Sequence, residues 1–189
     1  MKKPDDNALY WGLLDNLSPF KTKYFYPIAC FVFIIIAITF PPANYDGFLS
    51  VSSSSQVQNS HKVLYDATFL CSIFTLMSLS IKYTFIGFDP KFQERLEAYS
   101  LDIYQYKKSQ KQSYTPKKTF IVTCLIFGTL IFVFFITPPM LEDNIKYDWI
   151  YRGNVYISFI GMYFLFLGAL SGTLMSILST EVYRNFRRK

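Results

Sequence analysis

The sequence predicts an all-α membrane protein with four transmembrane helices arranged as two tandem helical hairpins. Three observations predict this fold class. Only 17% of the 189 residues are charged, against roughly 25% in an ordinary soluble domain. The apolar residues gather in four long blocks, and the basic residues gather on one side of the membrane that these blocks would cross. A soluble helical core is disfavoured, because a core helix of this length normally carries a polar stripe.

Each apolar block is long enough to cross the hydrocarbon core of a bilayer. The blocks cover residues 24–40, 63–81, 119–137 and 155–178. A helix rises about 1.5 Å per residue, so roughly 20 residues cross a core about 30 Å thick. Helices are expected because every backbone N–H and C=O needs a partner where water is absent.

The N-terminal segment, residues 1–23, does not resemble a cleavable signal. Acidic residues and Trp11 stand where an apolar stretch of about 7–15 residues is required. The first apolar block is therefore expected to direct membrane insertion itself. Residues 8–17 (ALYWGLLDNL) either form a short amphipathic helix along the membrane interface or belong to a partly ordered tail.

The basic residues predict the orientation in the membrane. Residues 1–23, 82–118 and 179–189 together hold 16 of the 19 lysines and arginines. The positive-inside rule places these segments and both termini in the cytoplasm, and loops 41–62 and 138–154 outside. The expected location is the cell inner membrane. Topology and attraction to lipid headgroups explain the net charge of +6, so no nucleic acid is expected as a partner.

The central cytoplasmic segment, 82–118, is expected to contain an amphipathic helix over residues 90–108. Asp89 and Pro90 suit the N-cap and the first position of a helix. Apolar residues then recur as on one helix face: Phe92, Leu96, Tyr99, Ile103 and Tyr106. This face is expected on the membrane or on a partner, and a solvated linker is the alternative. Three lysines are candidate contacts with the membrane surface or a partner: Lys107, Lys108 and Lys111.

The two halves of the chain repeat one another. The motif P-x-K-T at residues 19–22 recurs at 116–119, and the double proline at 41–42 recurs at 138–139. Because two spans return the chain to the same side, these repeats predict two parallel hairpins, residues 24–81 and 119–178. Proline lacks an N–H and clashes inside a helix, so each double proline should end the first helix of its hairpin.

The predicted spans carry few groups that can do chemistry. Asp66 and Glu181 are expected at opposite membrane faces, and His61, the only histidine, is expected at the surface of an outer loop. The three cysteines fall in different spans, which disfavours a disulfide or a metal site: Cys30, Cys71 and Cys124. No catalytic residue, cofactor or metal is expected, and an enzyme, an ion-coupled transporter and a selective channel are all disfavoured.

Small residues at four-residue spacing suit close packing between membrane helices. In the fourth span Gly168 and Gly172 form a GxxxG motif, flanked by Gly161 and Ser176. The second span carries a similar series: Ala67, Cys71 and Thr75. These faces either close the four-helix bundle or mediate self-association or binding to another protein.

The sequence therefore predicts a non-enzymatic inner-membrane protein that acts through helix association. Small four-span proteins without an active site occur among bacterial conflict systems. By this analogy the chain is expected to be a defence (antiviral) effector that perturbs the inner membrane. Two alternatives stay open: an immunity or exclusion protein that blocks a toxin or conjugation machinery, and an accessory subunit of a membrane complex.

Overall fold

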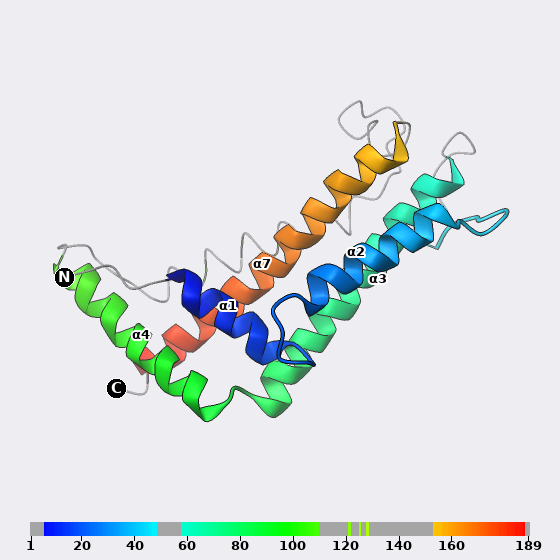
Figure 1. Cartoon of the computed structure of the whole chain (residues 1–189). Helices are drawn as coiled ribbons and strands as arrows, with labels where there is room; N and C mark the ends of the chain where they lie inside the picture. Colours follow the sequence, from blue (N-terminus) through cyan, green and yellow to red (C-terminus); the bar gives the residue numbers. More distant parts are fainter. Residues whose placement is uncertain are drawn as a thin grey trace. The chain divides into compact units, whose positions relative to one another are not determined.

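The computed structural model describes residues 6–48, 58–109, 121, 125, 128 and 153–187 (Figure 1). All regular secondary structure within these residues is helical, which confirms the all-α class for this part of the chain. The elements follow in this order: α1 (Asp6–Leu17), α2 (Phe25–Thr39), α3 (Asn59–Ile81), the π-helix η2 (Lys82–Ile86), α4 (Pro90–Ser109) and α7 (Val155–Arg187).

The third predicted span, residues 119–137, lies outside the described residues apart from Ile121, Leu125 and Gly128. The internal repeat and the second hairpin therefore stay predictions. The helix expected over residues 90–108 is present as α4.

Local sequence explains where several helices begin and end. α2 ends at Thr39, ahead of the double proline at 41–42. The side chain of Asn154 caps α7, because its Oδ1 accepts a hydrogen bond from the Tyr156 N–H at 2.9 Å. α4 begins at Pro90, whose fixed φ suits the first position of a helix.

The π-helix η2 continues α3 before the chain turns into α4 (Figure 1). The Gly87 N–H donates a hydrogen bond to the Lys82 carbonyl oxygen at 3.0 Å, which spans five residues instead of four. Gly87 has a φ of 75°, a conformation that L side chains rarely adopt. Glycine therefore suits the position where the helix ends.

Two helices in the described residues are long and apolar enough to cross a membrane: Asn59–Ile86 and Val155–Asn185. In Asn59–Ile86, 17% of the most apolar stretch is buried. In Val155–Asn185, 44% of the corresponding stretch is buried. A core helix of a soluble protein would bury most of such a stretch. α2 is also apolar, but its 15 residues are fewer than the roughly 20 that cross a bilayer.

The helix α7 is longer than the apolar block that predicts it. It begins at Val155, as expected, but continues past residue 178 to Arg187 and has 33 residues. At about 1.5 Å per residue this is roughly 50 Å, well beyond the thickness of a hydrocarbon core. Much of the predicted C-terminal tail, 179–189, is therefore helical.

The chain forms two compact units. Unit 1 consists of Met1–Phe25, Ser78–Gly128 and Ser171–Lys189, and unit 2 consists of Tyr26–Met77 and Thr129–Leu170. The charged residues are divided unequally between them. Within the described ranges, all charged residues belong to unit 1 except three: Asp46, Lys62 and Asp66.

In unit 1, α1 packs against α4 near the start of that helix. Four leucines of α1 are buried at helical spacing: Leu9, Leu13, Leu14 and Leu17. Phe92 and Leu96 of α4 are buried too, and a Cβ atom added to Gly12 would lie 2.9 Å from the Phe92 ring. The expectation that a membrane or a partner covers this face needs correction at Phe92, because α1 of the same chain lies against it.

In unit 2, α2 buries one narrow stripe fully and leaves much of its remaining surface exposed. The stripe repeats every four residues: Tyr26, Cys30, Ile34 and Ile38. The Phe31 ring lies 5.3 Å from Phe159 and 5.4 Å from Tyr163 on α7, and the Tyr163 hydroxyl donates to the Pro27 carbonyl oxygen at 3.0 Å. The exposed side of α2 is almost wholly apolar: Ile28, Phe31, Val32, Phe33 and Ile36.

Candidate functional site

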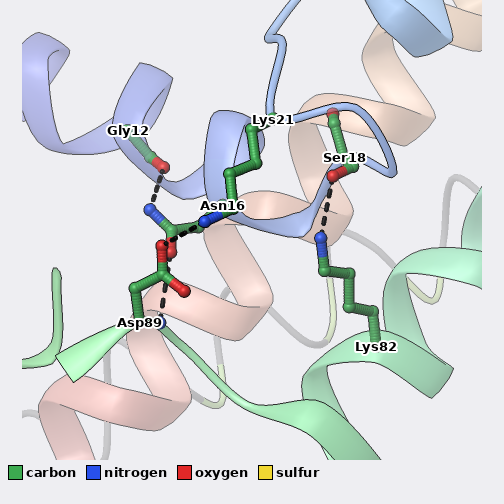
Figure 2. A network of polar contacts seen from close by, with 6 residues as sticks. All are labelled: Gly12, Asn16, Ser18, Lys21, Lys82 and Asp89. Carbon is green, nitrogen blue, oxygen red and sulfur yellow. Dashed lines mark hydrogen bonds and ion pairs between the residues drawn. The ribbon is translucent and has the colours of Figure 1, made fainter.

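A polar network in unit 1 ties the end of α1 to the start of α4 (Figure 2). The Asn16 side chain donates to the Gly12 carbonyl oxygen at 3.3 Å and accepts from the Asp89 N–H at 3.2 Å. The Lys21 ammonium lies 3.1 Å from the Asp89 carboxylate. Both partners of this ion pair are exposed, so it contributes at most about 1 kcal/mol. The network therefore orients α1 more than it stabilises the unit.

A lysine at the start of η2 extends the same network. The Lys82 ammonium donates to the Ser18 carbonyl oxygen at 2.8 Å, just beyond the end of α1 (Figure 2). Carbonyl groups at a helix C-terminus lack intrahelical partners, and a lysine is a favourable donor there. Ser18 itself is buried. Lys82 thus joins the start of η2 to the loop between α1 and α2.

Among the charged residues of unit 1 that the structure describes, the most deeply buried is Glu181 in α7. The Glu181 side chain is fully buried, and its Oε1 accepts a hydrogen bond from the Tyr83 hydroxyl at 2.6 Å. Its Oε2 lies 2.9 Å from the Arg184 guanidinium one helical turn later. A buried carboxylate is costly unless it is paired. Because Glu181 needs the Tyr83 hydroxyl as a partner, this contact favours one position of η2 against α7.

Asp66 plays a comparable part in unit 2. Its side chain is buried on α3, and its carboxylate accepts from the Tyr45 hydroxyl at 2.8 Å and from the Phe48 N–H at 2.6 Å. Burial, together with the hydrogen bond and charge of Asp66, raises the pKa of Tyr45 to about 12. The hydrogen bond from the Tyr45 hydroxyl fastens the loop after α2 to α3.

The expectation for His61 is wrong. α3 begins at Asn59, earlier than the apolar block suggests, and His61 is fully buried in its first turn. His61, Leu64 and Thr68 share one face at helical spacing, and all three are buried. Within the described ranges, histidine, cysteine and carboxylate side chains form no cluster that could hold a metal ion.

The two described cysteines are neighbours in unit 2. The Cys30 thiol on α2 and the Cys71 thiol on α3 lie close to each other, and both are free thiols. Cys124 lies outside the described residues.

The GxxxG face of α7 is not its most buried face. Gly161, Gly168, Gly172 and Ser176 are half-buried, whereas bulky residues fill the buried face: Phe159, Met162, Phe166 and Leu170. A Cβ atom added to Gly168 would meet no described atom within 4 Å. Close packing at this face stays a prediction.

The small residues of the second span lie partly in the core of unit 2. Ala67 and Thr75 are buried, while Cys71 is half-buried. Of the three predicted contact lysines, Lys108 is exposed near the end of α4. The Lys107 side chain and the whole of Lys111 lie outside what the structure describes. Their role at a membrane or partner surface stays a prediction.

Sequence reasoning did not find the contacts of Glu181 or the packing of α1 on α4. The spacing of Glu181 and Arg184 was a usable signal, because residues three apart are neighbours on a helix. Tyr83 carried no such signal, since 98 residues separate it from Glu181.

No protein-family model, curated protein sequence or solved structure matches this chain. Function is therefore inferred from the residues and their geometry. The described polar side chains mainly join one helix to the next, and the described apolar helices expose much of their surface.

Proposed function

We propose that the protein is a multi-pass inner-membrane protein that acts through helix association, as a defence effector that breaches the membrane once assembled. The proposal includes four spans with both termini in the cytoplasm. It rests mainly on the low burial of the apolar helices. With 17% and 44% of their most apolar stretches buried, Asn59–Ile86 and Val155–Asn185 leave large apolar surfaces that lipid or another copy would cover.

The composition of unit 1 supports the proposed orientation. Unit 1 brings together parts of the three segments that the positive-inside rule assigns to the cytoplasm, 1–23, 82–118 and 179–189. It also holds nearly all charged residues of the described ranges. Unit 2 contains the most apolar parts of the described helices. This division is the one expected of a cytoplasmic surface and a lipid-embedded region.

The small-residue face of α7 supports assembly. A Cβ atom added to Gly168 would meet none of the described atoms within 4 Å, and Gly172 follows one turn later. Helices approach closely at such positions, and small residues are enriched at the interfaces of membrane helices. Copies that associate along α7 would present few polar groups to lipid. They would breach the bilayer by enclosing water or by thinning it.

The orientation is tested by labelling of single cysteines in a variant that lacks the native cysteines. Cysteines that replace Ser53 and Glu142 should react with a membrane-impermeant thiol reagent in intact cells. A cysteine that replaces Ser109, at the end of α4, should react only after the cells are opened. Labelling of position 109 alone in intact cells would reverse the proposed topology.

The effector function is tested by strong induction of the full chain without any partner gene. We expect loss of membrane potential, dye uptake and growth arrest. The double variant Gly168→Leu with Gly172→Leu should self-associate about fivefold more weakly and depolarise less, because the added side chains block close approach.

A matched control adds similar bulk elsewhere: Ala29→Leu, at an exposed position of α2, should leave self-association and depolarisation unchanged. A polarised, growing culture at high expression contradicts a constitutively active effector. If that culture also resists one particular toxin or plasmid, the immunity or exclusion alternative is favoured.

A further inference from the structure

An aromatic–lysine cluster lies on the surface of unit 1, formed by Trp11, Lys23 and Tyr24. The Lys23 ammonium lies 5.5 Å from the centre of the Trp11 ring and 5.0 Å from that of Tyr24. Trp11 is 45% exposed and Tyr24 is 56% exposed. Phe20 extends the exposed aromatic surface. The cluster therefore presents two amphipathic rings and one cation to whatever adjoins this surface.

The position of the cluster in the chain relates it to the membrane boundary. Trp11 is on α1, and its ring is exposed whereas the four leucines of that helix are buried. Lys23 and Tyr24 directly precede α2, which begins at Phe25. Tryptophan and tyrosine concentrate at the headgroup level of membranes, and a lysine there extends its ammonium toward water and phosphate.

The charge of Lys23 is available to an external anion. Lys21, two residues earlier, is engaged by Asp89 at 3.1 Å. Lys23 forms no ion pair with a carboxylate in the part of the chain that the structure describes. An ammonium has three donors, and a lysine that contacts the faces of two rings still directs N–H groups outward.

We propose that the aromatic–lysine cluster binds the anionic phospholipid headgroups of the cytoplasmic leaflet and seats α1 along that surface. The proposal rests on the membrane insertion proposed above and adds the class of lipid that the N-terminal segment recognises. Charge complementarity favours this occupant, because a lysine beside two interfacial aromatic rings matches a phosphate layer above hydrocarbon. An acidic protein partner would not require exposed tryptophan and phenylalanine beside the start of an apolar helix.

The two tryptophans allow a direct test. Trp149→Phe leaves Trp11 as the sole tryptophan of the full chain. We reconstitute this variant into phosphatidylcholine vesicles with and without phosphatidylglycerol. Trp11 fluorescence should be quenched more by lipids brominated near the headgroup than by lipids brominated near the chain ends. Acrylamide in the aqueous phase should quench it less when phosphatidylglycerol is present.

Variants at Lys23 separate charge from packing. In anionic vesicles Lys23→Gln should shift the ratio of lipid-exposed to water-exposed Trp11 about fivefold toward water. Lys23→Arg should retain the parent behaviour, since arginine keeps both the charge and the ring contact. Lys91→Gln makes the same change in net charge on the exposed surface of α4 and should have little effect.

The outcomes distinguish this proposal from the one on which it rests. Release of the chain from vesicles by alkaline carbonate contradicts membrane insertion itself. Retention of the chain, with Trp11 quenched freely by acrylamide and not by brominated lipid, overturns only the headgroup contact. Equal effects of Lys23→Gln and Lys91→Gln overturn the specific role of the cluster in favour of a general charge effect.

Discussion

Glu181→Ala should lower the free energy of unfolding by about 3 kcal/mol, a large fraction of the stability of a small protein. The Glu181 side chain is fully buried and receives a hydrogen bond from Tyr83 at 2.6 Å. Its removal leaves a cavity and takes the acceptor from a partly buried hydroxyl. This expected loss of unfolding free energy is at the lower end for a broken buried ion pair. The reason is that Arg184 is 46% exposed, so water can solvate its charge.

The measurement is a reversible denaturant titration of the full chain in detergent micelles. Glu181→Gln keeps the volume and an acceptor for Tyr83, so it should cost only about 1 kcal/mol. Glu97→Ala removes the same charged group at an exposed position of α4 and should change stability by less than about 0.5 kcal/mol. Equal stability of the three variants would show that Glu181 does not hold η2 against α7.

Leu96→Ala should have a similar effect, about 3 kcal/mol, through a different cause. Leu96 is fully buried on α4, one helical turn after Phe92, and Phe92 lies against Gly12 of α1. Truncation loses the transfer free energy of the removed carbons and leaves a cavity that close-packed neighbours fill only in part. We also expect faster proteolysis within α1, because the contact between α1 and α4 is weakened.

Leu101→Ala is the matched control, since Leu101 is on the same helix but 40% exposed. It makes the same chemical change and should cost less than about 1 kcal/mol. Equal losses for the two variants, or unchanged proteolysis of α1 in Leu96→Ala, would contradict the packing described for unit 1.

Local sequence predicts two of the described helices closely, one from an apolar block and one from apolar periodicity. α2 covers 25–39 against an expected 24–40, and α4 covers 90–109 against 90–108. The end of α7 differs because hydropathy marks where a helix leaves lipid, whereas a helix ends where a breaker or cap intervenes. No glycine or proline follows residue 178 up to Arg187, so the helix continues through a polar sequence.

The contacts of the candidate site depend on tertiary structure and carry little local signal. The Asn16 contact with Asp89 joins residues 73 apart, and the Tyr83 contact with Glu181 joins residues 98 apart. His61 looked like a loop residue because the apolar block begins after it. His61 is buried because α3 begins at Asn59 and includes His61 in its first turn.

The π-helix η2 restricts how the length of this protein can change during evolution. Loss of one residue from Lys82–Ile86 would leave a stretch that forms ordinary α-helical hydrogen bonds, so local helix chemistry would tolerate the deletion. The same deletion would rotate the chain that follows by about 100° about the helix axis. Asp89 would then no longer face Asn16 and Lys21. Selection against a deletion in η2 would therefore act through the contacts that Asp89 makes with Asn16 and Lys21, and not through the helix itself.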